Sequence, residues 1–349
     1  TKDLLFEGIW NNNHINFEFD IFQTAYENRA LLFGAIDFKT DSTDIRIESS
    51  DLQILDKKWQ IQDNNLITLS GKEVLVDNFS IFNESQRIAI EGAISEDPKK
   101  KIVLNIDSLN LNNLNTLINK NLSGVVDGYG EASNLYNNVL IDNRFTLNEF
   151  KIDGFLIGNI IASSNWDNSK KQSDIKGSIK RQGFKILNLT GTYSPYTEEN
   201  LDLKAELNGT EVKVLEPFLD SYFTDFKGTL DGELAITGTL SKPLINGKGL
   251  INDAGMHVNY LNTDYNLYGK FYLNDNQIGF QDIEVFDRND NVGKINGYIS
   301  HTNFRNMGID LRAEIKNFQV LNTTSTDNKL FYGNGVATGN IYFIGPINN

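Results

Sequence analysis

The sequence contains no cysteine, and this absence excludes several kinds of chemistry at once. Disulfide bridges, thiolate metal ligands and cysteine nucleophiles all need the thiol group. Histidine is also scarce: His14, His257 and His301 lie far apart, and none has a partner at the spacing of a metal site. We therefore expect no bound metal and no cofactor, and we place the histidines at the surface or at the rim of a groove.

Long apolar runs are missing as well. No apolar stretch reaches the roughly 18 residues that a membrane-spanning helix needs. The first residues contain no basic segment followed by an apolar one, so no signal peptide is recognisable. We expect the chain to be a fragment of a longer protein whose anchor or signal lies outside it.

Positively charged residues are in the minority: the chain has 32 lysines and arginines but 46 aspartates and glutamates, and its formal net charge is −14. Nucleic acid is not expected as a partner, because its phosphates would be repelled. One local basic run departs from this balance and contains Lys170, Lys171, Lys176, Lys180 and Arg181. Either an anionic group such as a lipid phosphate docks on this run, or the run is a solvated strand face.

Alternation of apolar and polar residues is the dominant pattern and predicts β-strands. Leu201, Leu203 and Leu207 fall on one side of such a strand, while the charged residues between them fall on the other. Asn-Gly and Asp-Gly pairs recur between the strands and supply the tight turns of hairpins. The pattern predicts an all-β protein of about 25 strands.

Two sets of glycines indicate an internal repeat of about 105 residues. Gly92, Gly191 and Gly297 are spaced 99 and 106 residues apart. Gly124, Gly228 and Gly333 are spaced 104 and 105 residues apart. Between the landmarks we expect one brief helix or helical turn per repeat, within residues 109–121, 212–226 and 318–330; the second segment has its apolar residues at helical spacing.

So many strands, each with one apolar face, need more cover than a few short helices can give. Each repeat could close as a sandwich, or all repeats could share one long curved sheet with an apolar groove. The second architecture is favoured because no linker rich in proline, glycine or serine separates the repeats.

The segment 226–255 carries a family resemblance. Residues 228–232 read GTLDG, residues 238–243 read GTLSKP, and Gly249-Leu250 begins the next strand. This pattern resembles the translocation and assembly module family, TamB, within the AsmA-like group. Weaker copies occur at 122–133 and 332–346, and residues 1–65 match nothing beyond a strand-like pattern.

The resemblance implies an elongated, U-shaped sheet, or β-taco, with a hydrophobic groove that holds phospholipid acyl chains. It further implies a bridge for lipid transport between the inner and outer membranes of a diderm bacterium. The expected location is the periplasm, with attachment to either membrane through parts not present here. A role in outer-membrane biogenesis with an Omp85-type barrel partner is also implied.

The repeats suggest four parts of one elongated body: a first groove segment at 1–121, repeats at 122–225 and 226–330, and the start of a further repeat at 331–349. The alternation predicts that the charged Asp202, Lys204, Glu206 and Arg312 face water. The residues expected to line the groove are Ile102, Leu104, Ile106, Leu201, Leu203, Leu207, Leu234, Ile236, Ile309, Leu311 and Ile315.

No catalytic arrangement is recognisable, and we expect a protein that is not an enzyme. Residues 287–293 superficially resemble a calcium loop, but Tyr298 stands where the loop needs a bidentate glutamate, so a polar hairpin turn is the preferred interpretation. Two alternatives to lipid conduction stay open. One is a scaffold that assists outer-membrane protein assembly, and the other is a structural or adhesive stalk of closed β-repeats.

Overall fold

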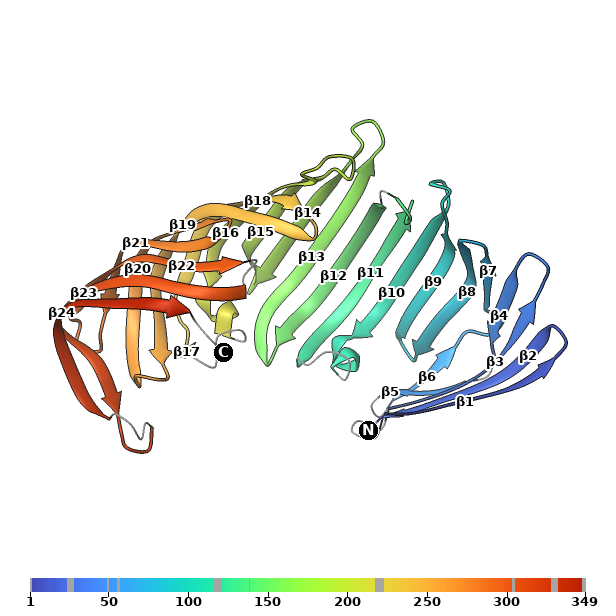
Figure 1. The fold of residues 1–349 in the computed structure, drawn as a ribbon, viewed down its shortest axis with the longest axis horizontal. Helices are drawn as coiled ribbons and strands as arrows, with labels where there is room; N and C mark the ends of the chain where they lie inside the picture. The colour runs from blue at the N-terminus through green and yellow to red at the C-terminus, as the bar shows by residue number, and fades with distance from the viewer. Residues whose placement is uncertain are drawn as a thin grey trace. The chain divides into compact units, whose positions relative to one another are not determined.

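The computed structural model describes residues 2–23, 28–48, 50–54, 57–115, 121–137, 139–216, 223–302, 305–327 and 332–346. Strands make up 76% of the protein and helices 3%, and 24 strands form one antiparallel sheet (Figure 1). This confirms the predicted all-β class. The chain divides into two compact units, Thr1–Gly177 and Ser178–Asn349, which are described one at a time.

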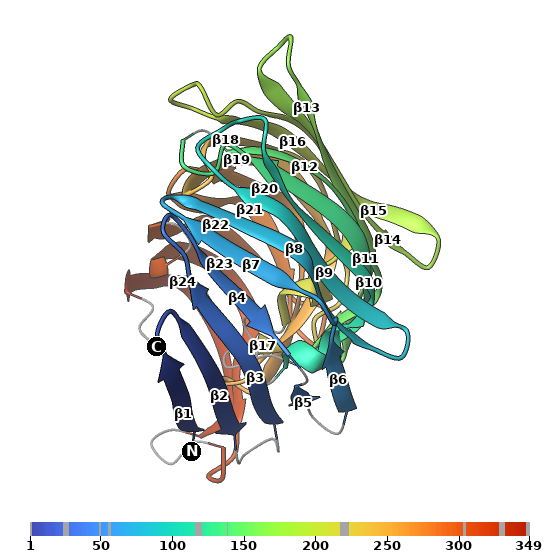
Figure 2. The ribbon, with the colours of Figure 1, turned by 90° about the vertical axis from the view of Figure 1, so that its right-hand side faces the viewer.

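Most strands of the first unit pair with the next strand along the chain, from β1 in dark blue onward in Figure 2. The region between β3 and β8 departs from this order, because β3 pairs with both β4 and β5, β4 pairs with β7, and β6 pairs with β8. The strands are β1 (Lys2–Asn11), β2 (His14–Gln23), β3 (Asn28–Phe38), β4 (Thr43–Ile47), β5 (Asp51–Ile54), β6 (Lys57–Ile61), β7 (Leu66–Ser70), β8 (Glu73–Asn83), β9 (Gln86–Ile94), β10 (Lys101–Asn110), β11 (Leu122–Ser133), β12 (Leu140–Ile152) and β13 (Phe155–Asp167), with β14 (Gln172–Arg181) crossing into the second unit.

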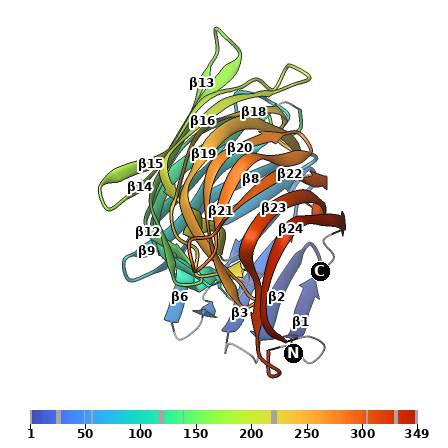
Figure 3. The ribbon, with the colours of Figure 1, turned by 90° about the vertical axis from the view of Figure 1, so that its left-hand side faces the viewer.

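In the second unit, β16 pairs with β18, while the two-residue β17 pairs with β19. The longer strands bend along their length, as Figure 3 shows for β19, β20 and β23. The strands are β15 (Phe184–Tyr193), β16 (Leu201–Glu211), β17 (Phe223–Thr224), β18 (Thr229–Thr239), β19 (Lys242–Val258), β20 (Thr263–Asn274), β21 (Gln277–Phe286), β22 (Val292–Thr302), β23 (Arg305–Thr323) and β24 (Gly333–Pro346).

The glycine landmarks mark equivalent places in the sheet. Gly92 pairs with Ile102, Gly191 with Leu203, and Gly297 with Leu311, each across one antiparallel strand pair. Hydrogen bonding between strands also continues where the sequence places repeat boundaries, from β10 to β11 and from β16 to β18. Strand pairing is therefore continuous across these two predicted boundaries.

Two of the three predicted helical segments contain a short 3₁₀ helix, at Leu111–Leu114 and at Val212–Leu215. In the first, the side chain of Asn110 accepts a hydrogen bond from the backbone N–H of Asn112 and caps the turn. In the third segment the prediction is wrong for residues 318–323, because β23 continues to Thr323 and pairs with β24. Beyond the strand, the backbone N–H of Asp327 donates to the carbonyl oxygen of Thr324 and closes a single turn. Residues 116–120, 217–222 and 328–330 of these segments lie outside the described part.

The buried residues gather in three clusters on the sheet. In the first unit, Trp59, Leu109, Leu111 and Val126 pack together under the first 3₁₀ helix. In the second unit, one cluster contains Val212 and Phe226, which both lie on the connection between β16 and β18. They pack against strand residues such as Ile251 and Phe271. The other second-unit cluster contains Val285, Ala313, Ile315 and Phe318. In each unit, residues on the connections between strands thus cover part of a sheet face. The rest of that face is covered only by the side chains of its own strands.

Candidate functional site

One face of the second unit is apolar across successive strands. Residues paired directly across an antiparallel ladder point to the same side of the sheet, so the register shows which side chains share a face. Leu203 pairs with Ile236, and Ile236 with Ile245. A longer series of such pairs runs through Leu234, Gly247, Leu273, Ile278, Ile299 and Ile309. We call the side that these residues share the apolar face of the second unit.

The residues expected to line a groove lie on this face with different degrees of burial. Leu203 keeps 9% of its surface exposed, and Leu201 and Ile315 are similarly buried. The half-buried members are Leu207, Leu234, Ile236, Ile309 and Leu311. The face therefore combines a few enclosed positions with a larger set of partly accessible apolar side chains.

The opposite side of the same strands carries charged residues that are exposed to solvent. Asp202, Lys204, Glu206 and Arg312 are exposed. Lys204 lies 3.2 Å from carboxylate oxygens of Glu206 and Glu233. Such exposed pairs contribute little stability, so their main effect is to keep this side hydrated.

The first unit has a corresponding apolar face. Leu104 pairs with Ile90 on one side and with Gly130 on the other, and Ile102 and Ile106 lie on the same side of β10. All three predicted lining residues of β10 are half-buried. A polar pair interrupts this face further along, where Asn143 pairs with Ser164 and donates a hydrogen bond to its hydroxyl oxygen at 2.8 Å.

An apolar pocket of about 240 Å³ lies near the start of the first unit. The residues that line it come from β1 to β4 and are Phe6, Phe17, Phe19, Leu32, Ile36, Ile45 and Ile47. All belong to the apolar face, because Phe6 pairs with Phe19 and Ile36 with Ile45. We did not predict this pocket; the alternation within residues 15–21 was the available signal, but the pairing partners were not evident from it.

The first strand leaves much of its apolar surface open. Trp10 is 71% exposed, and Leu4, Phe6 and Ile9 are also largely exposed. Within the described residues, β1 pairs only with β2, and at the other end of the sheet β24 pairs only with β23. Strand β24 likewise exposes Val336, Tyr342 and Ile344.

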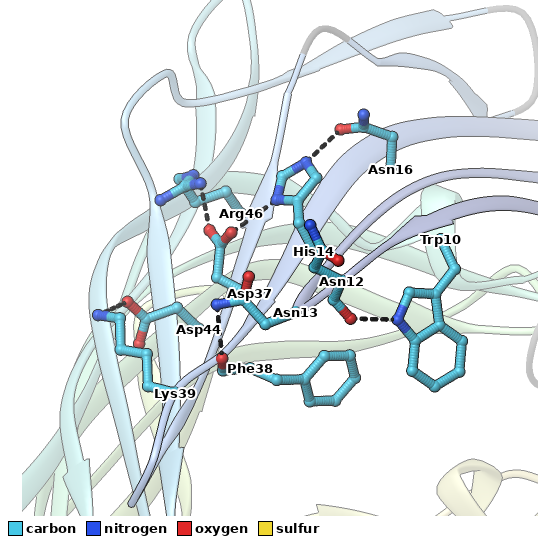
Figure 4. Close-up of polar contacts among 10 residues, drawn as sticks. All are labelled: Trp10, Asn12, Asn13, His14, Asn16, Asp37, Phe38, Lys39, Asp44 and Arg46. Carbon is cyan, nitrogen blue, oxygen red and sulfur yellow. Dashed lines mark hydrogen bonds and ion pairs between the residues drawn. The ribbon is translucent and has the colours of Figure 1, made fainter.

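On the opposite side of β2, β3 and β4, a polar cluster surrounds His14 (Figure 4). The imidazole Nδ1 lies 2.6 Å from Asp37 Oδ1, and its Nε2 lies 2.9 Å from Asn16 Oδ1. Arg46 donates to the other oxygen of Asp37. The hydrogen bond with Asp37 raises the pKa of His14, and the same bond lowers the pKa of Asp37. This cluster joins three neighbouring strands near their hairpin ends.

A second cluster of a histidine, an aspartate and an arginine occurs in the other unit. His257 Nδ1 lies 2.6 Å from Asp264 Oδ1, and Arg288 donates to Asp264 Oδ2. The third histidine, His301, is buried, so the expectation of a surface or rim position is wrong for this residue. Burial lowers its pKa. Among the residues that the structure describes, no three potential ligands from histidine, aspartate and glutamate come close enough to hold a metal ion.

Residues 287–291 form the connection between β21 and β22, as expected for a hairpin turn. The carboxylate of Asp287 accepts hydrogen bonds from the backbone N–H groups of Asn289, Asn291 and Gln319. Burial alone would raise the pKa of Asp287, but these donors outweigh burial and hold the pKa below its ordinary value. Its oxygens are thus occupied by N–H donors that organise the turn.

No family model, curated protein or solved structure matches this chain. Within the described ranges, the structure contains no helix of the length and apolar character needed to cross a membrane.

Proposed function

We propose that the apolar faces of both units bind the acyl chains of phospholipids while the charged opposite side stays in water. The observation that carries this proposal is the ladder of paired apolar residues in the second unit, many of them only half-buried. Removing apolar surface from water stabilises a complex by about 25 cal/mol per Å². A half-buried apolar face can gain this energy from a lipid chain, whereas a completely dry core has no surface left to offer.

The wider function that we infer is conduction of phospholipids between the inner and outer membranes of a diderm bacterium, without catalysis. The protein would then act in the periplasm and contribute to outer-membrane biogenesis. The sequence pattern at 226–255 and the one-sided apolar sheet both support this inference. Permanent anchoring in the membranes, as distinct from reversible contact with a bilayer surface, and binding to an Omp85-type barrel would use other parts of the protein.

The exposed edge strands favour a second candidate function. Strands β1 and β24 combine exposed apolar side chains with one unpaired edge among the described residues. Edges of this kind accept an additional strand from another chain. A scaffold that assists the assembly of outer-membrane barrels would use them in this way.

Site-specific photo-crosslinking tests the lipid-binding proposal. A crosslinking side chain at position 311 lies on the apolar face, and the same group at position 312 lies on the charged side. After irradiation with phospholipid vesicles, we expect lipid adducts at position 311 and few at position 312. Equal labelling at both positions, or none at 311, would favour a stalk with closed cores instead.

A further inference from the structure

The hairpin formed by β14 and β15 ends in a cationic tip with one exposed aromatic residue. Gln182 and Gly183 both have positive φ angles, 49° and 86°, and form the two-residue turn. Directly after the turn, Phe184 is 76% exposed. Lys180 and Lys185 flank the turn and are exposed as well. In Figure 3 the tip projects past the other strands of its own unit.

The charge around this tip is opposite to that of the whole chain. The sequence from Ile175 to Thr197 contains four cationic residues and no acid, although the protein carries a net charge of −14. In the structure, Arg181 pairs with Glu211 at 3.0 Å, so Lys180 and Lys185 supply the remaining positive charge at the tip. The tip is therefore a local positive site that an anionic partner can reach.

A pocket of about 380 Å³ lies beside the turn. Its lining combines apolar, amide, cationic and acidic groups, and the acid Glu211 is the ion-pair partner of Arg181. The lining residues are Arg181, Gln182, Phe184, Lys185, Ile186, Asn208, Gly209 and Glu211. Because Glu211 offsets the charge of Arg181, Lys185 leaves the lining with one net positive charge beside the apolar side chains of Phe184 and Ile186. This combination suits an amphipath whose charged end is an anion. Small-molecule sites start at roughly this volume.

We propose that this hairpin tip docks on the surface of a bilayer that contains anionic phospholipids. Phe184 would enter the interface, where aromatic side chains are favoured, while Lys180 and Lys185 contact lipid phosphates. A bilayer suits the tip better than an acidic protein does, because a stable protein interface needs about 800 Å² from each partner. A two-residue turn with its flanking side chains offers much less, whereas each cation near a charged bilayer adds affinity by itself.

The absence of cysteine allows a direct test with single labels. Phe184→Cys carries a fluorophore whose emission shifts to the blue in apolar surroundings. Leu240→Cys is the matched control, because Leu240 is 62% exposed at the turn between β18 and β19. With vesicles of equimolar phosphatidylcholine and phosphatidylglycerol, we expect a blue shift at position 184 only. Vesicles of phosphatidylcholine alone should give no shift at either position.

Charge variants test the same contact independently of the label. We expect the double substitution Lys180→Gln and Lys185→Gln to weaken vesicle binding about 25-fold, from roughly fivefold per cation. The matched control removes two exposed lysines of the same unit, with Lys294→Gln and Lys316→Gln, and should leave binding unchanged.

The proposal is overturned if position 184 stays in an aqueous environment, if both labels respond equally, or if the Lys180 and Lys185 variant binds normally. A partner that is an acidic protein would give the first of these results. None of these measurements involves Leu311, so their failure leaves the lipid-binding proposal for the apolar faces separately testable.

Discussion

Gly191 lies against the backbone carbonyl oxygen of Asp202 on the neighbouring strand, so closely that a Cβ atom at Gly191 would collide with that oxygen. Its φ angle is +147°, in the region that favours glycine. Gly92 makes the same approach to the carbonyl of Lys101, and Gly297 to that of Asp310. The glycines that mark the repeat in the sequence therefore mark one recurring backbone geometry in the sheet.

Substitution of Gly191 tests the importance of this geometry. We expect Gly191→Ala to lower the free energy of unfolding by about 2–4 kcal/mol, because the backbone must move or accept strain. Gly71→Ala is the control: its φ is +58°, but no atom lies within 4 Å of an added Cβ. That control should cost only about 1 kcal/mol for the unfavourable φ. Urea denaturation measures both, and equal losses would show that the close approach is unimportant.

Asp287 should make the stability of the second unit depend on pH in the acidic range. Its pKa is lowered in the folded protein from an ordinary value of 3.8, so the folded state binds its proton less readily than the unfolded state does. The stabilisation is complete above pH 3.8 and disappears as the pH falls through the folded pKa. Asp287→Asn replaces one acceptor oxygen by a donor opposite N–H groups, and we expect a loss of about 1–3 kcal/mol at neutral pH.

Denaturation at neutral and acidic pH checks this expectation. The difference between wild type and Asp287→Asn should shrink below pH 3.8, where the carboxyl group of Asp287 takes up a proton in the unfolded chain before it does so in the folded protein. A difference that is the same at every pH would mean that the carboxylate charge does not organise the turn.

The pKa values of His14 and His301 should be displaced in opposite directions from the ordinary value of 6.5. The hydrogen bond to Asp37 raises the pKa of His14, so its stabilising contribution is complete below pH 6.5 and is lost as the pH rises through the folded pKa. Burial lowers the pKa of His301, so protonation of the unfolded chain reduces stability as the pH falls below 6.5. NMR titration of the imidazole signals measures both values. Asp37→Asn should return the pKa of His14 toward 6.5 and leave that of His301 unchanged.

Alternation was sufficient to predict the all-β class and which side of β16 and β23 is charged. It succeeds because successive residues of a strand point to opposite sides of the sheet. The polarity of Leu203 and Lys204 is therefore enough to assign each of them to a side. It could not predict which strands pair out of order, such as β4 with β7. There, Asn65 bonds to both the N–H and the C=O of Ile47, a contact between residues whose pairing no local pattern specifies.

The third predicted helix shows a different limit. Residues 318–323 have apolar positions compatible with a short helix, yet they extend β23. The backbone N–H of Gln319 bonds to the carboxylate of Asp287, and Phe318 pairs with Ala337. Both partners are distant in sequence, so tertiary contacts determine the local conformation. The small apolar pocket near Phe17 was missed for the same reason, since it depends on four strands meeting in register.

Leu311→Asp is the decisive variant for lipid conduction. A conduit works only if its apolar path is unbroken, and a carboxylate at Leu311 would place a hydrated charge in the path of each passing acyl chain. Since 1.4 kcal/mol already corresponds to a tenfold change in rate, desolvating a charge by several kcal/mol should reduce lipid transfer at least ~10-fold. Leu311 is half-buried, so its replacement can stay hydrated, and we expect the melting temperature to change little.

Two further variants separate conduction from stability. Arg312→Asp adds a carboxylate on the exposed side of the same strand and should leave lipid transfer unchanged. Leu203→Asp should impair both transfer and folding, because Leu203 is only 9% exposed and a buried charge destabilises the protein. Transfer of a fluorescent phospholipid between vesicles and thermal unfolding are measured for each variant. If Leu311→Asp unfolds the protein as Leu203→Asp does, position 311 belongs to a closed core, and the structural stalk becomes the better account of this sheet.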